Sequence, residues 1–291
     1  MGSKNQLALA ILARMPHADN FYDLFAGGCA ITHAACLSGK FKQVYTNDIE
    51  PLPMKLLQDA IDGKHVNENR WISREDFNRL RFEDPYVACC FCFGGDWRSY
   101  AYSAENEKLK RALHFAIFFN DFSELESLEI IIPTNLTKSQ SASRRYAELR
   151  KFFKQKKQHI VLESLGRLGR LQRLGRPKIT VGDYRQIKIK PDSVIYCDIP
   201  YQNAERYIRQ KAFDYDGFFE WCGEQIEPLF ISSYELPKDK FTVIAELRHR
   251  QLLDGLRNNR KAIIEKVYRP KHQLSQSPVK HFYQQDLFGE D

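Results

Sequence analysis

The sequence predicts an α/β fold in which one mainly parallel sheet is interrupted by an inserted, mainly helical domain. β-Prone apolar runs alternate with helical patterns in two separate parts of the chain, residues 1–64 and 178–270. In residues 65–177 this alternation lapses and helical patterns dominate. A chain of 291 residues is long enough for one α/β domain and a second, smaller one. We therefore expect both outer parts to share one sheet, with residues 271–291 as a C-terminal tail.

The first outer part reads as a β-α-β unit that follows a short helix predicted over residues 4–15. Residues 21–25 form the first predicted strand, which runs into a tight turn at Gly27 and Gly28. The second strand ends at Asp48, 20 residues beyond Gly28. Such a turn lets a ligand approach the backbone at the positive end of a helix, and an acid about 20 residues further on can reach ribose hydroxyls.

The glycine turn does not match the dinucleotide fingerprint G-x-G-x-x-G, because its two glycines are adjacent. The pattern therefore favours a nucleoside cofactor that has no pyrophosphate. An ordinary turn that binds no ligand is the alternative for these two glycines.

After the middle part, the apolar run 194–197 predicts a buried strand that ends in Asp198-Ile199-Pro200-Tyr201. Pro200 has no N–H to donate and holds Ile199 in extended geometry. An acid, a constrained turn and an aromatic ring thus emerge at a carboxyl strand end, the edge where open α/β sheets bind ligands. A strand that simply ends in a polar turn is the alternative. The other strand candidates here are residues 179–182, which lead to Asp183 and Tyr184, and residues 229–234, 241–247 and 262–268.

Residues 138–178 form a basic block with 13 Lys or Arg and two acids. This block has a net charge of +11, so the remainder of the chain carries −4 of the total of +7. A basic block on an acidic body indicates a polyanion-binding surface. From residue 165 to 176, Leu and Arg recur every three residues, a period that keeps neither on one helix face and excludes a coiled-coil seam. A low-complexity connector between domains is the alternative.

An aromatic and glycine-containing loop over residues 91–102 lies earlier in the middle part and includes Arg98. Its rings could stack on or wedge between nucleic-acid bases. They could equally form the core of a subdomain.

Composition excludes several classes of protein. Hydrophobic residues are 43 % and charged residues 28 %, which is typical of a globular chain. The seven cysteines are odd in number and have no zinc-ribbon spacing, and no secretory leader precedes them, so we expect reduced thiols and no metal site. No apolar run reaches the roughly 18–20 residues that cross a bilayer. We expect a cytoplasmic protein with no membrane segment.

These motifs, in this order, resemble those of the Dam-type, alpha-group DNA adenine-N6 methyltransferases, which use S-adenosylmethionine. The resemblance covers residues 1–60 and 179–269, and the middle part more loosely resembles phage-borne members. It implies a Rossmann-like methyltransferase sheet with an inserted target-recognition domain. It also implies methyl transfer to the exocyclic amine of an adenine flipped out of double-stranded DNA at a specific site, as in restriction–modification systems.

The cofactor motifs of this family correspond to four segments of the sequence. Gly2-Ser3-Lys4 resembles a glycine-glycine-lysine whose lysine helps hold the methionine end of the cofactor. Residues 23–28 resemble the family's cofactor loop, with Cys29 where a third glycine is common. Asn47-Asp48 resembles the ribose-binding segment, and Gly182-Asp183-Tyr184 the segment that contacts the cofactor adenine. The implied cofactor-binding residues are Lys4, Asp23, Phe25, Gly27, Gly28, Asp48, Asp183 and Tyr184.

Asp198-Ile199-Pro200-Tyr201 resembles the family's catalytic Asp-Pro-Pro-Tyr, with Ile199 in place of the first proline. The Asp198 carboxylate and the Ile199 carbonyl would accept the two N–H groups of the adenine amine, while Tyr201 stacks on the base. Positioning and charge placement then carry most of the catalysis of a direct in-line transfer. Every residue has the carbonyl that position 199 uses, so we expect activity to survive. The implied catalytic residues are Asp198, Ile199, Pro200 and Tyr201.

The resemblance implies two binding partners, double-stranded DNA and, through the C-terminal tail, a second protein. Residues 284–288, Gln-Gln-Asp-Leu-Phe, resemble the peptide by which bacterial proteins dock on the DNA sliding clamp, with Gln285 where leucine is usual. The arginines that we expect to contact DNA phosphates are Arg98, Arg144, Arg145, Arg167, Arg170 and Arg173.

Two other functions remain open from the sequence. One is a catalytically weak, methylase-like DNA-binding protein, for which Ile199 and the Leu/Arg repeat are the only support. The other is methylation of RNA or of a protein amide, which the basic block and the order of the motifs disfavour.

Overall fold

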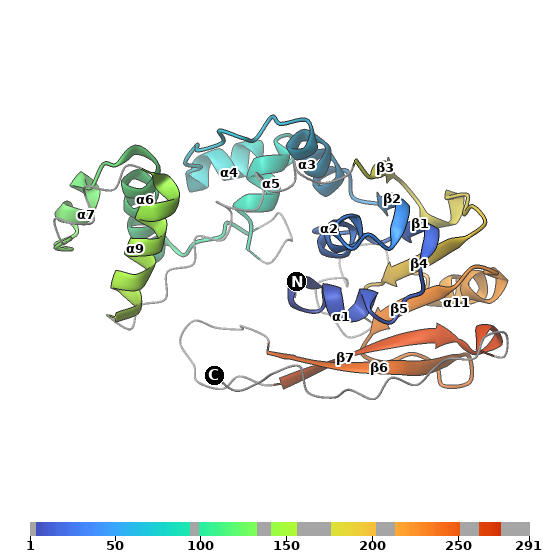
Figure 1. Ribbon diagram of the computed structural model, residues 1–291. Helices are drawn as coiled ribbons and strands as arrows, with labels where there is room; N and C mark the ends of the chain where they lie inside the picture. Colours follow the sequence, from blue (N-terminus) through green and yellow to red (C-terminus); the bar gives the residue numbers. More distant parts are fainter. Residues whose placement is uncertain are drawn as a thin grey trace.

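The computed structural model describes residues 4–93, 99–132, 141–155, 176–201, 213–250 and 262–274. In these residues one seven-stranded sheet has the order β3-β2-β1-β4-β5-β7-β6 (Figure 1). The first five strands in this order are parallel, and β7 runs antiparallel to both of its neighbours. The strands are β1 Ala18–Asp23, β2 Phe41–Asp48, β3 Lys178–Val181, β4 Ser193–Asp198, β5 Leu229–Ser233, β6 Phe241–Arg250 and β7 Ala262–Pro270.

The two outer parts of the chain meet in the middle of this sheet. β1 pairs with β4, so that Phe21 lies opposite Val194 and Tyr22 lies opposite Ile195. The strand order reverses between β1 and β4, which is the topological switch point of a Rossmann-like sheet. The predicted fold class is therefore confirmed.

Successive residues of the central strands face two separate apolar layers. Phe21 and Val194 belong to a cluster with α1 and α2, whereas Tyr22 and Ile195 belong to a cluster with α11. Each of these four side chains is at most 1 % exposed. Because both faces of the sheet are covered, the strands read as continuous apolar runs. The helices that flank the sheet are α1 Ala8–Leu12, α2 Ala30–Leu37, α3 Pro51–Ile61 and α11 Tyr215–Glu224.

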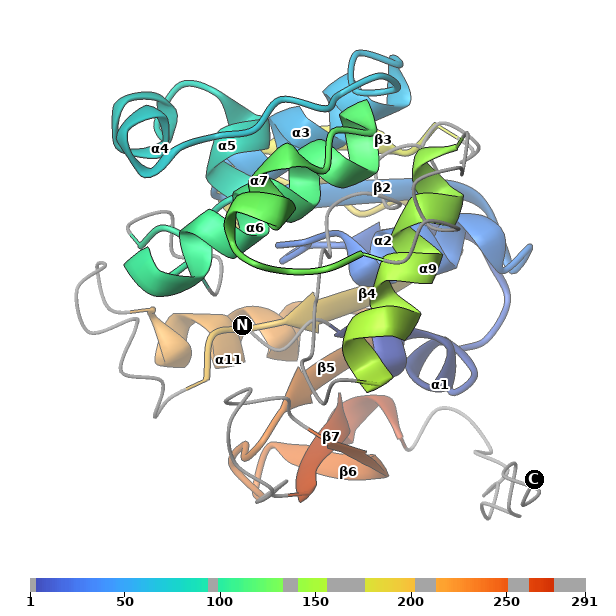
Figure 2. The same ribbon diagram turned by 90° about the vertical axis from the view of Figure 1, so that its left-hand side faces the viewer.

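The inserted part is helical in its described residues, and it packs around two apolar clusters. α4 and α5 pack on α3 through a cluster that includes Leu56, Phe77 and Tyr86. α6, α7 and α9 enclose a second cluster that includes Leu113 and Phe153. Figures 1 and 2 show these three helices beyond α4 and α5, away from the sheet. The helices are α4 Arg74–Leu80, α5 Pro85–Cys90, α6 Ala104–Phe119, α7 Ser123–Ser127 and α9 Ala142–Gln155.

The aromatic loop that precedes α6 is largely core. Phe91 is 3 % and Tyr100 8 % exposed, and both belong to the cluster of α4 and α5. Phe93, in contrast, is 60 % exposed. The interpretation of this segment as subdomain core therefore holds for Phe91 and Tyr100. Arg98 lies outside the described residues.

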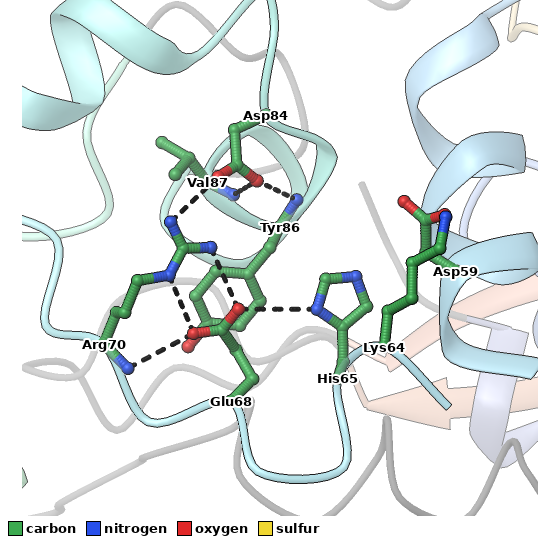
Figure 3. A network of polar contacts seen from close by, with 8 residues as sticks. All are labelled: Asp59, Lys64, His65, Glu68, Arg70, Asp84, Tyr86 and Val87. Carbon is green, nitrogen blue, oxygen red and sulfur yellow. Dashed lines mark hydrogen bonds and ion pairs between the residues drawn. The ribbon is translucent and has the colours of Figure 1, made fainter. Parts of the chain in front are cut away.

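A polar network fastens the segment between α3 and α4 to the start of α5 (Figure 3). Arg70 donates from Nε and Nη2 to the two carboxylate oxygens of Glu68, each at 2.9 Å, and from Nη1 to Asp84 at 3.0 Å. Asp84 also caps α5, accepting from the backbone N–H of Tyr86. His65 lies 3.5 Å from Glu68 and stacks on the ring of Tyr86. Charge-assisted hydrogen bonds thus fix the junction between the sheet domain and the insertion.

Candidate active site

Carboxylates line one edge of the sheet. Asp23 ends β1, Asp48 ends β2 and Asp198 ends β4, and these strands are parallel. Asp183 follows β3 after Gly182, whose N–H donates to the Asp48 carbonyl at 3.0 Å. The four acids therefore lie along the carboxyl edge, as the strand pattern predicts for Asp48, Asp183 and Asp198, whereas Asp23 ends a strand that was expected to continue to Phe25.

The glycine turn and Asp48 form one hydrogen-bonded unit. Asp48 accepts from the Gly27 N–H at 2.7 Å and from the Glu50 N–H at 2.9 Å. Gly27 has a φ of +47°, and Cys29, which caps α2, has a φ of 59°. A Cβ placed on Gly27 or Gly28 would meet no atom within 4 Å. The space above this turn is therefore open to a ligand.

Asp23 lies beneath that turn. Its Oδ2 accepts from the backbone N–H of Thr32 at 3.0 Å and from the Thr32 hydroxyl at 2.7 Å. Its Oδ1 is buried and has no hydrogen-bond partner among the described residues. Burial, together with the nearby carboxylates of Asp198 and Asp48, raises the pKa of Asp23 to about 7, although the Thr32 hydrogen bonds oppose the shift.

The segment after β3 combines a half-buried acid with a buried ring. Asp183 pairs with Arg185 at 2.6 Å, and this hydrogen bond lowers the pKa of Asp183. Tyr184 is 7 % exposed and packs against Phe25 with ring centroids 5.0 Å apart. Burial raises the pKa of the Tyr184 hydroxyl, which has no hydrogen-bond partner among the described residues. Phe25 and Tyr184 are thus placed side by side close to the glycine turn.

The sheet edge holds a second, denser cluster around Asp198. Lys4 Nζ lies 3.1 Å from Asp198 Oδ1 and 3.0 Å from Glu265 Oε1, and it also donates to the Tyr201 hydroxyl. That hydroxyl lies 3.2 Å and 3.1 Å from the two carboxylate oxygens of Glu265. The Asp198 side chain is 26 % exposed, whereas Lys4 is 7 % and Glu265 1 % exposed. Asp198 is therefore the acid that faces outward.

Two acids share one lysine in this cluster. Burial raises the pKa of Asp198 and of Glu265, and Lys4 opposes both shifts. Burial alone would lower the pKa of Lys4, but the attraction of the two carboxylates outweighs it and the pKa is raised. The two carboxylates thus favour the protonated form of Lys4, and Lys4 in turn limits how far burial raises the pKa of each acid.

The residues that follow Asp198 are held by packing rather than by a second proline. Ile199 is 2 % exposed and lies in the apolar cluster of the α11 face. The Tyr215 hydroxyl donates to the Pro200 carbonyl at 2.9 Å. The Tyr201 ring stacks on Tyr234, with centroids 4.2 Å apart, so one face of Tyr201 is already covered.

Sequence reasoning missed Glu265, whereas residues 231–234 resemble a segment that supports the family's catalytic site, and Tyr234 of that segment stacks on Tyr201. Glu265 belongs to the buried side of β7, together with Val267 and Arg269. An acid on the apolar side of a predicted strand is a signal that could have revealed it. Lys4 was predicted from the resemblance to hold the cofactor, and the structure places its ammonium group against Asp198.

The structure describes two of the six arginines that we expected to contact DNA. Arg144 has an exposed side chain that pairs with Glu148 at 3.1 Å. Arg145 is 6 % exposed and donates to the carbonyls of Ile117 and Phe118 at 2.7 Å and 3.3 Å. The prediction of a DNA contact is therefore wrong for Arg145, which instead ties α9 to α6. The other four, Arg98, Arg167, Arg170 and Arg173, lie outside the described residues, as do residues 284–288.

No group of three or more His, Cys, Asp or Glu side chains among the described residues is placed to hold a metal ion. Every helix among them is too short or too polar to cross a membrane.

A sheet of this order, with acids along its carboxyl edge and an open glycine turn after β1, defines a Rossmann-like methyltransferase. The family model for D12 class N6 adenine-specific DNA methyltransferases matches residues 1–220. Because the match spans most of the chain, the protein belongs to that family, whose members transfer a methyl group to N6 of adenine in DNA.

Other comparisons add little. Two structures of the rRNA methyltransferase aviRa from Streptomyces viridochromogenes are each 12 % identical in sequence and match over 94 % of this chain. The matches cover 88 % and 86 % of those chains, with TM-scores of 0.37 and 0.35. Likeness at this level supports no argument. No curated protein sequence matches the chain.

Proposed function

We propose that the protein is a site-specific DNA methyltransferase that takes the methyl group from S-adenosylmethionine and acts on an adenine flipped out of the duplex. The observation that carries the proposal is the placement of Asp198. Its carboxylate is the exposed member of a buried cluster and lies on the same sheet edge as Asp48 and the open turn at Gly28.

The residues present fit S-adenosylmethionine. The space above Gly27 and Gly28 is unfilled, and the adjoining Asp48 carboxylate can accept from ribose hydroxyls in addition to its backbone donors. The unpartnered Oδ1 of Asp23 offers a carboxylate oxygen beneath the same turn. Ile49, directly after Asp48, is 70 % exposed and offers an apolar surface for an adenine ring.

When bound, the cofactor supplies an electrophilic methyl group on a sulfonium. The protein then has to hold the adenine amine in line with that methyl group. The amine is a poor nucleophile because its lone pair is delocalised into the ring. Asp198 and the carbonyl of Ile199 would accept its N–H groups and favour the geometry in which the lone pair is available. Taking the base out of the duplex costs a few kcal/mol, which contacts to the flipped base and the DNA backbone have to offset.

The test is methylation of DNA by the purified chain with radiolabelled S-adenosylmethionine, followed by long-read sequencing of the product. We expect N6-methyladenine in one sequence context. The Asp198→Asn variant should lose methylation by on the order of 100-fold or more, because a charged acceptor at the reacting amine is removed. It should still bind duplex DNA in a gel-shift assay. Asp239→Asn, at an exposed acid, is the control and should match the wild type.

The same binding and methylation assays distinguish an enzyme from a methylase-like DNA-binding protein. If the wild-type chain binds DNA and S-adenosylmethionine but methylates no DNA, the proposed function is wrong. Methylation of RNA in preference to DNA would contradict it as well.

A further inference from the structure

Glu265 is a buried acid that the family assignment does not reach. It lies on β7, beyond the residues 1–220 that match the family model, and its side chain is 1 % exposed. A carboxylate in such a place is costly unless it is paired and hydrogen-bonded. The cost of burying the Glu265 carboxylate is therefore offset by the groups that pair with it.

Those partners are the groups that also contact Asp198. Lys4 Nζ is 3.0 Å from Glu265 Oε1 and 3.1 Å from Asp198 Oδ1, so the ammonium group is placed between two carboxylates. The Tyr201 hydroxyl lies within 3.2 Å of both oxygens of Glu265. Lys4 comes from η1 (Lys4–Gln6), Asp198 from the end of β4 and Tyr201 from the turn after β4. The Glu265 carboxylate on β7 thus links Lys4 and Tyr201 next to Asp198.

A lysine paired with Asp198 alone would satisfy the carboxylate that has to accept the adenine amine. A second carboxylate shares the donors of that lysine and leaves Asp198 electron-rich. We propose that Glu265 is a positioning residue of the methyl-transfer site, which holds Lys4 and the Tyr201 hydroxyl so that the Asp198 carboxylate remains available to the substrate amine. This inference rests on the proposed function.

The charge of Glu265 also sets a measurable pH dependence. The titratable groups that interact with Asp198 are Lys4, Glu265, Tyr201, Tyr196, Tyr234, Cys197 and Asp23. Like charges hold each other's protons more tightly, and the carboxylate of Asp198 raises the pKa of Glu265, so we expect the charge of Glu265 to raise the pH at which Asp198 ionises. Removing this charge should move the acidic limb of the pH–rate profile to lower pH. A residue that only fills space would leave that limb where it is.

The experiment compares Glu265→Gln with the wild type in kcat, in KM for DNA and for S-adenosylmethionine, and in the pH profile of kcat. We expect kcat to fall about 10- to 100-fold, since the acceptor is then mispositioned. Both KM values should change by less than about threefold, because no substrate contact is removed. Glu265→Asp, which keeps the charge, should have an intermediate kcat and the acidic limb of the wild type.

The matched control is Glu246→Gln, which removes an exposed carboxylate from β6 of the same hairpin. It should leave kcat and the pH profile unchanged. In a double-variant cycle, adding Glu265→Gln to Lys4→Gln should cost little beyond Lys4→Gln alone, because Glu265 acts through Lys4. Fully multiplicative losses would overturn the inference.

The failure of this inference is distinguishable from the failure of the proposed function. A wild-type chain that transfers no methyl group to DNA refutes the function. An active wild type together with an equally active Glu265→Gln variant, with an unmoved acidic limb, refutes only the role of Glu265. Cofactor affinity by calorimetry and the melting temperature are measured for each variant. If Glu265→Gln does not fold, the kcat and pH profile of Glu265→Asp decide, and wild-type values for both overturn the inference.

Discussion

Lys4 Nζ lies 3.0 Å from Glu265 Oε1, so the first described residue of the chain meets the last strand of the sheet. The contact brings together a 3₁₀ turn before β1 and an antiparallel strand that follows β6 in the chain. It is made next to Asp198, at the end of β4. η1 and β7, from opposite ends of the described chain, therefore complete the cluster around Asp198.

Gly28→Val should weaken cofactor binding without affecting the fold. A Cβ at this position meets no protein atom within 4 Å, so the side chain would occupy only the space proposed for the cofactor. We expect the Kd for S-adenosylmethionine, measured by calorimetry, to rise at least about tenfold, which corresponds to about 1.4 kcal/mol. Gly223→Ala, in α11 and equally free of contacts, is the control and should bind normally. Unchanged affinity in Gly28→Val would place the cofactor elsewhere.

Asp23→Asn should change how stability depends on pH. The pKa of Asp23 is raised from 3.8 to about 7, chiefly by burial, so the folded state holds this proton more tightly than the unfolded state. The resulting stabilisation is full below pH 3.8 and is lost as the pH rises through about 7. The neutral variant avoids the cost of burying a charge. Its free energy of unfolding should therefore rise relative to that of the wild type between pH 4 and 8, by on the order of 4 kcal/mol at most.

The measurement is urea unfolding of both proteins at several pH values across that window. Asp62→Asn, at an exposed acid at the end of α3, should run parallel to the wild type. A constant difference between Asp23→Asn and the wild type would show that Asp23 keeps an ordinary pKa.

Substitutions at Ile199 should reveal how much of the catalytic turn depends on packing. The side chain is 2 % exposed, so Ile199→Val should lower the free energy of unfolding by about 0.5–1.5 kcal/mol and Ile199→Ala by about 2–5 kcal/mol. We expect kcat to stay near the wild-type value in the valine variant and to fall in the alanine variant, in which the Ile199 carbonyl can shift. Ile226→Ala, at a side chain that is 88 % exposed, should stay within about 0.5 kcal/mol. Equal stability of Ile199→Ala and the wild type would contradict the packing argument.

Arg70→Ala should loosen the junction between the sheet domain and the insertion. The substitution removes hydrogen bonds to Glu68 and Asp84 and leaves two carboxylates facing each other (Figure 3). We expect a loss of about 1–3 kcal/mol in thermal or urea unfolding. Arg70→Lys should restore only part of it, since an ammonium group cannot form the paired contacts of a guanidinium. Arg79→Ala breaks an exposed pair within α4 and should cost less than about 1 kcal/mol.

The sheet and its acid edge could be predicted because local signals agree there. Apolar runs end in Asp23, Asp48 and Asp198, and both faces of these strands are buried, so each run stands out from its surroundings. The parallel order then follows from general rules for α/β folds.

The role of Glu265 could not be predicted in the same way. β7 lies between β5 and β6 in the sheet although it follows both in sequence, and this pairing is a tertiary property. β7 also carries Lys266 and Arg269, so the sequence alone does not show which of its charged residues belongs to the cluster around Asp198. Only the three-dimensional order of the strands brings Glu265 to Lys4.

Arg145 is a different kind of error, because the sequence held the correct answer. Arg145, Leu149 and Phe153 follow one another at intervals of four residues, which places them on one face of a helix. Leu149 and Phe153 are each 1 % exposed, and Arg145 is buried beside them. The number of basic residues in a block does not show which of their side chains are buried when the segment forms a helix.

The contact between Lys4 and Glu265 has a consequence for the folding of the enzyme during its synthesis on the ribosome. Lys4 leaves the exit tunnel long before β7 is translated, and β1 must wait for β4 before it has both of its sheet neighbours. A nascent chain that has made Asp198 but not yet β7 lacks the carboxylate that shares the lysine. On the role proposed for Glu265, we expect a nascent chain to reach its full rate of methyl transfer only after β7 has been synthesised and has added to the sheet, so that unfinished polypeptides methylate DNA more slowly than the complete chain.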